Sequence, residues 1–320
     1  MGALLSCLQR ADNPSLPLSF PSLKPSKSKA SNTSFWRKIS WTMSSVFNTA
    51  SDFGWSVLKS SFIEDDKTPI RSGGEGADFQ PICISRIEFS TDHIKDIKSK
   101  LGVTINDVVT GIEFYGTRLY MQEKDSKSNT SNSTALVLMN TRNIEGYQSI
   151  DDMLNTKKSN GPWGNRISFL HVPIPKLNET RISNPLEFIH DTHNIINRKK
   201  HSLVLALTGT LLDIEGKIRG LEAVAKHMRK TVIMSSTVVT NLVGPVQQKS
   251  LAKHPIKGLY FTLAGGPESL VISIISYMGM LRVTLKTERD FIDEQRLKTC
   301  IQNAFEMIFK ATMELDFETN

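Results

Sequence analysis

The sequence predicts an α/β protein in which a mixed sheet is flanked by helices, and three observations lead to this class. Stretches rich in β-branched residues alternate along the chain with amphipathic stretches of helical period. The chain has 320 residues, of which 39% are hydrophobic, so it can bury a large core. Glycine and proline separate the stretches, as at Gly102, Gly244 and Pro245. The order of the strands does not follow from these patterns.

The elements can be assigned in order along the chain. We expect strands at Ile82 to Phe89, 135–142, Ile167 to Val172 and 231–245, and three more strands in a meander over 256–288. We expect helices at 91–101, from Asn106 to Met121, at 184–202, 202–216 and 221–232, and a closing helix over 290–315. Polar loops connect them, among them 122–134.

The N-terminal quarter of the chain differs in composition from the rest. Residues 12–34 are rich in proline, serine and lysine and lack apolar periodicity, so we expect a flexible linker. Residues 35–66 carry Trp36, Ile39 and Met43 at helical spacing beside basic residues. This segment is an amphipathic helix that either lies in a membrane interface or packs on another domain. Residues 67–320 then form the main domain.

Charge and cysteine content limit the classes of partner. Lys and Arg number 39 against 32 Asp and Glu, a net charge of +7 that favours anionic partners such as phosphates or lipid headgroups. No nucleic-acid-binding signature accompanies the charge, so nucleic acid is not an expected partner. Three scattered cysteines, Cys7, Cys83 and Cys300, favour reduced thiols over a disulfide framework or a metal site. No run of about 18 apolar residues indicates a membrane span.

The helix from Asn106 to Met121 combines the strongest periodicity with polar residues in its first turn. Gly102 ends the preceding helix and Thr104 can cap this one. Asp107 would face the positive end of the helix dipole, where capping contributes about 0.5 to 2 kcal/mol. A purely structural role therefore stands beside a functional role for Asn106 and Asp107.

Two other groups of polar residues are candidates for a site. The strand that ends in Asn241 and the turn at Gly244 and Pro245 can bring amides to a sheet edge facing a substrate carbonyl, or it can be a tight turn only. His190 and His193 lie three apart on one helix, a spacing compatible with metal, but no third ligand is evident and no metal is expected. His171, inside a strand, is structural or faces solvent or a cavity.

Five motifs occur in a fixed order: "INDVVTGIEFYGTRLYM" from Ile105, "MNTRNIEG" from Met139, "WGNRISFLHVPIP" from Trp163, "TNLVGP" from Thr240 and "ISYMGMLRVTL" from Ile275. In this order they resemble the plant-type wax ester synthase/diacylglycerol acyltransferases of the CoA-dependent acyltransferase superfamily. The resemblance extends from about residue 80 to about residue 312. Thr240 stands where the family usually has serine, and the hydroxyl is kept.

The resemblance implies a fold and an activity. The fold would be the C-terminal half of a two-lobed acyltransferase. The activity would be transfer of a fatty acyl group from acyl-CoA, as a substrate and with no other cofactor, to a long-chain alcohol or to diacylglycerol. Asn106 and Asp107 would support the site, and Asn241, Gly244 and Pro245 would line the substrate channel. The implied location is the endoplasmic reticulum membrane, with the plasma membrane as the alternative, so a membrane surface is an expected partner.

The family's catalytic motif, His-His-x-x-x-Asp-Gly, does not occur in this sequence, whose seven histidines are nowhere adjacent. Residues 1–11 resemble the helix that follows this motif in the family. We therefore expect the chain to be the C-terminal portion of a longer enzyme, without the general base and inactive alone. The alternative is a non-catalytic acyltransferase-like domain that binds acyl-CoA or a partner chain.

Overall fold

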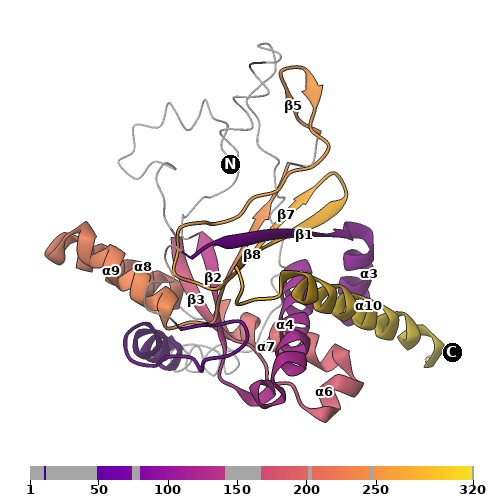
Figure 1. Cartoon of the computed structure of the whole chain (residues 1–320), viewed down its shortest axis with the longest axis horizontal. Helices are drawn as coiled ribbons and strands as arrows, with labels where there is room; N and C mark the ends of the chain where they lie inside the picture. Colours follow the sequence, from indigo (N-terminus) through magenta and orange to yellow (C-terminus); the bar gives the residue numbers. More distant parts are fainter. Residues whose placement is uncertain are drawn as a thin grey trace, which may run out of the picture.

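A six-stranded mixed sheet organises the molecule in the computed structural model, which describes Ala11 and residues 49–73, 80–140, 167–200, 204–245 and 248–318. The strands follow the order β1 (Ile82–Ser90), β8 (Met280–Glu288), β7 (Leu270–Tyr277), β4 (Thr237–Val243), β2 (Thr134–Asn140), β3 (Ile167–Pro173). The pairs β4 with β7 and β2 with β4 are parallel, whereas the other three pairs are antiparallel. Helices lie against this sheet (Figure 1), so the predicted fold class is confirmed.

The hairpin of β7 and β8 shows how local sequence fixes the register. Met278 and Gly279 occupy its two-residue turn with φ angles of 51° and 73°. Positive φ at both positions is the requirement of a type I′ turn, whose twist matches that of the flanking strands. Tyr277 therefore pairs with Met280, and the side chains of both strands alternate between the two faces of the sheet.

Four helices cover one face of the sheet: α3 (Thr91–Leu101), α4 (Ile105–Lys124), α7 (Pro185–Lys200) and α10 (Glu294–Glu318). α4 is central, because it packs on both α7 and α10. Two glycines allow this close packing. A Cβ atom on Gly111 would lie 2.4 Å from Ile189 Cδ1 of α7, and one on Gly116 would lie 2.5 Å from Ile301 Cα of α10.

The opposite face of the sheet is covered by helices around β2 and β4 and by a polar segment around β1 and β8. Around β2 and β4, α8 (Val204–Arg219) and α9 (Leu221–Ile233) supply the cover, and Met228 and Val232 of α9 pack on Leu136 and Val238. Around β1 and β8 the face is polar. There the ring of Tyr260 lies against Arg86 and Arg282, 4.9 and 5.6 Å from its centroid to the two guanidinium carbons.

The prediction of three strands over 256–288 is wrong, because only β7 and β8 form there. The segment before β7 crosses the polar face and is held by Tyr260, which also forms a hydrogen bond with Glu88 of β1, instead of pairing with a strand.

Other elements also differ from the prediction, and some of them were not predicted at all. A hairpin of two short strands, β5 (Ser250–Leu251) and β6 (His254–Pro255), was not predicted. The strand expected from residue 231 begins at Thr237, since residues 231–233 complete α9. The loop expected over 122–134 includes the end of α4 and the 3-10 helix η2 (Ser126–Thr130). The short helix α6 (Glu179–Ser183) was also not predicted.

A helix at residues 49–61 packs with its polar side inward. Asp52, Ser56 and Lys59 are buried, whereas Trp55 and Leu58 of the same helix are exposed. The described part of the predicted 35–66 segment therefore buries the side that an amphipathic helix usually exposes. Residues 35–48, the predicted linker and all but one of residues 1–11 lie outside the described residues.

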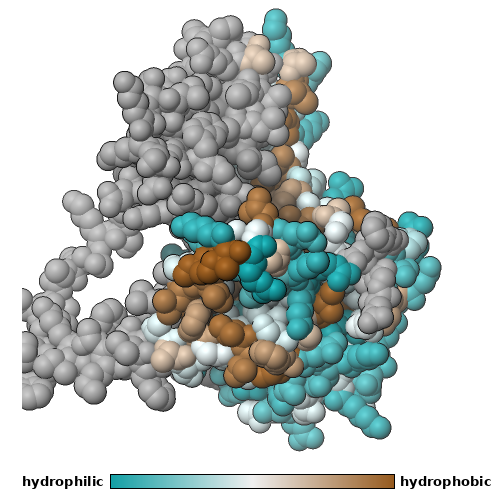
Figure 2. Space-filling view, turned by 90° about the vertical axis from the view of Figure 1, so that its left-hand side faces the viewer, coloured by the Kyte–Doolittle hydropathy of each residue, from teal (hydrophilic) through white to brown (hydrophobic). Residues whose placement is uncertain are grey.

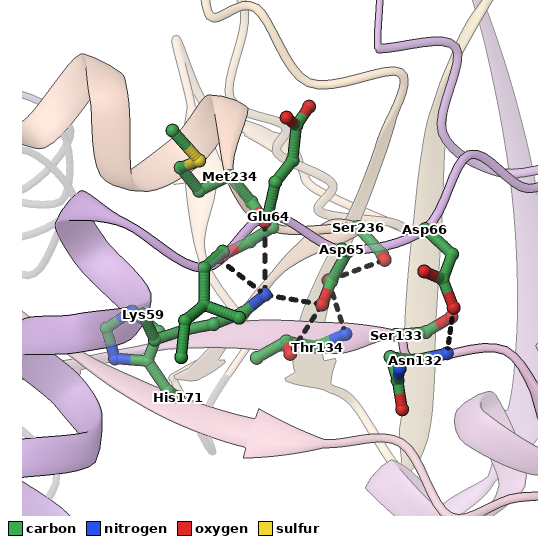
Figure 3. A network of polar contacts seen from close by, with 12 residues as sticks. Lys59, Glu64, Asp65, Asp66, Asn132, Ser133, Thr134, His171, Met234 and Ser236 are labelled. Atoms are coloured by element: carbon green, nitrogen blue, oxygen red, sulfur yellow. Dashed lines mark hydrogen bonds and ion pairs between the residues drawn. The ribbon is translucent and has the colours of Figure 1, made fainter.

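A buried ion pair and several hydrogen bonds attach this helix to the sheet (Figure 3). Lys59 Nζ lies 2.6 Å from Asp65 Oδ1, and both side chains are almost fully buried. Asp65 in turn accepts hydrogen bonds from the backbone N–H and the hydroxyl of Thr134, at the start of β2, and from the hydroxyl of Ser236, just before β4. A buried carboxylate with this many donors is compensated for its loss of hydration, so the network fixes residues 59–65 to the two strands.

Candidate functional site

The start of α4 lies beside β4, and polar side chains from three elements meet there. Thr104 caps the helix: its hydroxyl accepts from the backbone N–H of Asp107, and Asp107 Oδ2 accepts from the backbone N–H of Thr104 at 2.9 Å. This reciprocal capping box satisfies two donors that a helix start otherwise leaves unpaired. The capping role expected for Asp107 is therefore present, and its carboxylate is buried.

Asn106, the residue before Asp107, reaches the sheet. Its Oδ1 accepts a hydrogen bond of 2.7 Å from Nδ2 of Asn241, near the end of β4. Asn241 lies on the same face of the sheet as Val239, the face that the helices cover. The structure therefore brings together Asn106 and Asn241, two of the site residues expected from the sequence. Each amide keeps donor or acceptor capacity beyond this one bond.

Asp107 also contacts a histidine that the sequence did not connect with it. Nδ1 of His193, on α7, lies 2.7 Å from Asp107 Oδ2, and the side chains are 27% and 2% exposed respectively. Helix packing explains the meeting. Gly111 contacts Ile189 across α4 and α7, and Asp107 and His193 each lie one turn from that contact.

The contact between Asp107 and His193 could be expected from the sequence only in part. Small residues in α4, such as Gly111, indicate close approach of another helix, but the sequence does not say which helix or at what register. His193 was considered only for metal with His190. Among the described residues there is no group of three or more His, Cys, Asp or Glu side chains that could hold a metal ion.

Gly244 and Pro245 are buried at the end of β4. A Cβ atom on Gly244 would lie 1.9 Å from the carbonyl oxygen of Ser276 on β7, so only glycine fits there. The backbone N–H of Gly244 also donates to the Ser276 hydroxyl at 3.4 Å. Packing against β7 is thus sufficient to explain Gly244, and the channel-lining role expected for these two residues remains a prediction.

The chemistry of the Asp107–His193 contact follows from its hydrogen bonds. Asp107 Oδ2 accepts from the backbone N–H and the hydroxyl of Thr104 and faces the positive end of the α4 dipole, all of which stabilise an ionised carboxylate. An ionised carboxylate only accepts, so Nδ1 of His193 is the donor. In the neutral imidazole, Nε2 then carries the lone pair, and Nε2 is available as a proton acceptor.

His171, another histidine singled out from the sequence, has a structural role. Its ring nitrogens lie 3.0 Å from Ser56 Oγ and 3.4 Å from Ser60 Oγ of helix 49–61. Burial, together with the charges of Lys199 and Lys59, lowers the pKa of His171 to about 3. The ring is therefore neutral, and His171 forms part of the contact that holds helix 49–61 on β3.

Glu113 lies two turns along α4 from Asn106 and is fully buried. Neither of its carboxyl oxygens has a hydrogen-bond partner among the described residues. Burial raises the pKa of Glu113 well above its ordinary value of 4.5. The protonated form is therefore favoured, since a neutral carboxylic acid costs far less to bury than an ion.

No helix in the described ranges combines the length and the apolar character needed to cross a membrane.

Comparison with known proteins gives a consistent family. Residues 163–309 match the family described as the WS/DGAT C-terminal domain. Wax ester synthase/diacylglycerol acyltransferase 5 of Arabidopsis thaliana is 29% identical over 92% of this chain and 62% of its own length. Wax ester synthase/diacylglycerol acyltransferase 6 of the same plant is 26% identical over 99% of this chain and 66% of its own length. The chain thus spans less than two thirds of the length of these relatives. The resemblance seen in the five motifs is confirmed.

Two solved structures are also similar. The wax ester synthase/diacylglycerol acyltransferase from Marinobacter aquaeolei VT8 is 13% identical, with a TM-score of 0.48 over 79% of this chain and 52% of that chain. The TRI3 trichothecene 15-O-acetyltransferase from Fusarium sporotrichioides is 12% identical, with a TM-score of 0.49 over 89% of this chain and 54% of that chain.

Proposed function

We propose that this chain, which carries the C-terminal domain of the wax ester synthase/diacylglycerol acyltransferase family, acts in the transfer of a fatty acyl group from acyl-CoA to a hydroxyl. The acceptor would be a long-chain alcohol, giving a wax ester, or diacylglycerol, giving triacylglycerol. The observation that carries the proposal is the meeting of Asn106, Asp107, His193 and Asn241 where α4 begins beside β4.

This arrangement suits acyl transfer for a physical reason. Attack of a hydroxyl on a thioester places negative charge on the carbonyl oxygen, and donors fixed in advance stabilise that charge. Asn241 Nδ2 is held by Asn106, so its second N–H has a defined direction without further ordering. Ligands in open α/β sheets usually bind outside the carboxyl ends of strands, and Asn241 lies near that end of β4.

We also propose that the protein works at a membrane surface, in the endoplasmic reticulum or alternatively at the plasma membrane. Helix 49–61 and the residue after it present Trp55, Leu58 and Phe62 to solvent, and the adjoining ends of α8 and α9 present Ile218 and Leu221. Phe62 and Leu221 are 77% and 83% exposed. Figure 2 looks at the side on which α8 and α9 lie in Figure 1, and hydrophobic side chains gather there beside hydrophilic ones.

The exposed apolar residues at helix 49–61 lie next to those at the ends of α8 and α9. Ser60 and Ser61 line one hollow of about 500 Å³ together with residues of α8 and α9, including Arg219 and Lys226. Lys230 Nζ also lies 5.9 Å from the ring centroid of Phe62. Aromatic and aliphatic side chains with cations at their edge are typical of a surface that enters the headgroup region of anionic lipid.

The membrane proposal has a direct test. Phe62→Ser and Leu221→Ser should each lower flotation with phosphatidylserine-containing liposomes, because each removes apolar area that would enter the lipid. Phe291→Ser is a matched control, since Phe291 is also partly exposed but lies between β8 and α10. Equal flotation of the unchanged protein and of Phe62→Ser, Leu221→Ser and Phe291→Ser would contradict the proposal.

The acyltransferase proposal is tested by two measurements on one protein, a longer form of this chain that also includes a His-His-x-x-x-Asp-Gly segment. Isothermal titration with palmitoyl-CoA measures binding of the donor, and chromatography of products with hexadecanol or diacylglycerol measures ester formation. Binding with ester formation supports the enzyme. Binding without it, in a protein that also includes a His-His-x-x-x-Asp-Gly segment, would favour the alternative of an acyl-CoA-binding domain. Absence of binding would reject both.

A further inference from the structure

We propose that the hollow between helix 49–61, α8 and α9 binds the headgroup of an anionic phospholipid that carries an amine, which is the chemistry of phosphatidylserine. The phosphate of the headgroup lies against lysine side chains of α9, and its ammonium group lies against Glu222. This inference rests on the membrane association proposed above and names the lipid. The hollow is separate from the meeting of α4 and β4, because α9 leads into the first residue of β4, Thr237, whereas Asn241 lies near the last.

The hollow has the size and the polar walls of a ligand site. Its volume is about 500 Å³, within the range of pockets that hold small molecules. Ser60 and Ser61 line it from the end of helix 49–61, and Ala223, Lys226 and Lys230 line it from one side of α9, where residues three or four apart are neighbours. Side chains that can donate hydrogen bonds to phosphate oxygens therefore lie on two sides of the hollow.

The charges around the hollow complement those of phosphatidylserine. Three of the side chains that line the hollow are cations, Arg219, Lys226 and Lys230, and two are carboxylates, Glu215 and Glu222. Without the histidine that also lines it, the hollow therefore has one more cation than carboxylates. Phosphatidylserine has an anionic phosphate, an anionic carboxylate and a cationic ammonium group, so its anionic groups are in excess by one. Each charged group of the lipid thus finds a partner of opposite sign in the hollow.

The two carboxylates of the hollow differ in how firmly they are held. Glu215 is only 12% exposed and is occupied by Arg219 at 3.1 Å and by His227 at 2.8 Å. Glu222 is 82% exposed and pairs with Lys226, one turn further along α9, at 2.9 Å. Such an exposed pair contributes little to stability, so a headgroup can exchange partners with it at small cost. Its phosphate then binds the lysine, and its ammonium group binds Glu222.

Exposed apolar residues border the hollow and favour a lipid over a free phosphate ester. Phe62, Ile218 and Leu221 are largely exposed, and each is adjacent in sequence to a residue that lines the hollow. Lys230 Nζ lies 5.9 Å from the ring centroid of Phe62 and forms no ion pair within the described part of the chain. When these apolar side chains enter the acyl region of a bilayer, the hollow and its lysines are held at the depth of the headgroups.

Glu222 distinguishes headgroup recognition from general attraction between a cationic surface and an anionic membrane. General attraction depends on the surface charge of the membrane, which is equal for vesicles with equal fractions of phosphatidylserine and phosphatidylglycerol. Phosphatidylglycerol is anionic but has no amine. A contact between Glu222 and the ammonium group therefore favours phosphatidylserine alone, whereas a solvated crevice with surface ion pairs favours neither lipid.

The experiment measures by flotation how the 320-residue chain partitions into phosphatidylcholine vesicles that contain equal fractions of one or the other anionic lipid. The unchanged protein should prefer phosphatidylserine, and Glu222→Gln should lower the ratio of the two partition coefficients by about two- to fivefold, the range for one exposed charged contact. Glu187→Gln is the matched control, because Glu187 is also exposed and lies in the first turn of α7, and it should keep the ratio. Absence of a preference in the unchanged protein, or a preference that Glu222→Gln keeps, would overturn the headgroup site. Lys230→Gln should lower partition into both kinds of vesicle by about fivefold, since both lipids have a phosphate, and an unchanged partition would also overturn it.

Soluble forms of the lipid separate failure of the headgroup site from failure of the membrane association. If the unchanged protein floats with both kinds of vesicle without a preference, the headgroup site is rejected and the membrane association stands. If it floats with neither, the membrane association is rejected, and calorimetric titration with dihexanoyl phosphatidylserine below its critical micelle concentration tests the hollow alone. Binding that Glu222→Gln weakens supports the site, whereas no binding, or equal binding by both proteins, overturns it. Glycerophosphoserine has the same headgroup without acyl chains, so binding as tight as that of the lipid would show that the ligand is a free phosphodiester and that the lipid assignment is wrong.

Discussion

Asn241 and Asn106 are 135 residues apart in sequence, yet Nδ2 of Asn241 donates to Oδ1 of Asn106 at 2.7 Å. The bond joins β4 to the first turn of α4 at the surface of the described chain. Because it is exposed, it contributes little to stability. Its main effect is to fix the direction of the second N–H of Asn241.

From this we predict that Asn241→Ala lowers the rate of acyl transfer with little effect on stability. Loss of one donor to a developing oxyanion typically costs about 10² to 10³ in rate. The melting temperature should barely change, because the bond is exposed. Turnover and thermal unfolding of the same preparation measure both. If the variant unfolds early while keeping its specific activity, the "TNLVGP" turn is structural and the role assigned to Asn241 is wrong.

Asp107→Ala should act mainly through stability. The substitution removes the acceptor of the Thr104 backbone N–H, of the Thr104 hydroxyl and of His193, at one end of a buried helix. We expect a loss of about 2 to 4 kcal/mol in the free energy of unfolding, above the 0.5 to 2 of a cap alone. Thr104→Ala is the matched control, since it removes the cap hydroxyl but leaves the His193 contact. Urea unfolding that shows equal losses for both variants would mean that the His193 bond adds no stability.

Much of the fold could be predicted from the sequence, because its elements are long and strongly periodic. α4 begins and ends close to the predicted residues, since Thr104 and Asp107 form a local capping box and Gly102 ends α3 with a φ of 66°. The segment around Tyr260 was predicted as a strand because it alternates apolar and polar residues. Its contacts with Arg86 and Arg282, which lie on other strands, override that pattern.

The candidate site was predictable only in part, for a related reason. Asn106, Asp107 and Asn241 stand beside turns and caps that local sequence defines. His193 joins them through the packing of α4 on α7, a relation between residues 86 positions apart. Similarly, the inward-facing polar side of helix 49–61 depends on His171 and Lys199, which the local sequence of that helix does not contain.

Close packing of α4 on α10 should make Gly116 intolerant of a side chain. A methyl group there would lie 2.5 Å from Ile301 Cα and 3.0 Å from Ile301 N, backbone atoms that cannot move aside alone. We expect Gly116→Ala to destabilise the protein by about 1 to 3 kcal/mol. Gly54→Ala is the control, because nothing lies within 4 Å of its Cβ position in helix 49–61, and it should be neutral or stabilising by up to about 1 kcal/mol. Equal melting temperatures of the two variants would contradict the close approach.

His171 should make the protein sensitive to mild acid. Its pKa in the folded protein is about 3, below its ordinary value of 6.5, so between these values the unfolded chain binds a proton that the folded chain does not. Stability is therefore present above pH 6.5 and falls as the pH drops below it, by at most about 1.4 kcal/mol per unit. Urea unfolding of His171→Gln between pH 7 and 5.5 should show a smaller fall than that of the unchanged protein. His254→Gln, at an exposed histidine, should not reduce the fall, and an unchanged slope in His171→Gln would contradict the buried neutral ring.

Glu113 should lower the stability of the protein as the pH rises, which is the opposite of the effect of His171. Because burial raises its pKa in the folded protein above 4.5, the folded chain binds a proton that the unfolded chain has released once the pH exceeds that value. Stability is then fully present below pH 4.5 and is lost as the pH rises toward the pKa of the folded state. Glu113→Gln keeps the size and polarity of the protonated acid but cannot ionise, so its stability should decline less between pH 5 and 8. Glu187→Gln, at an exposed position of α7, is the control and should follow the unchanged protein. If the Glu113→Gln and unchanged proteins lose stability in parallel across this range, Glu113 is not protonated in the folded protein, and the carboxylate has found a partner that compensates its charge.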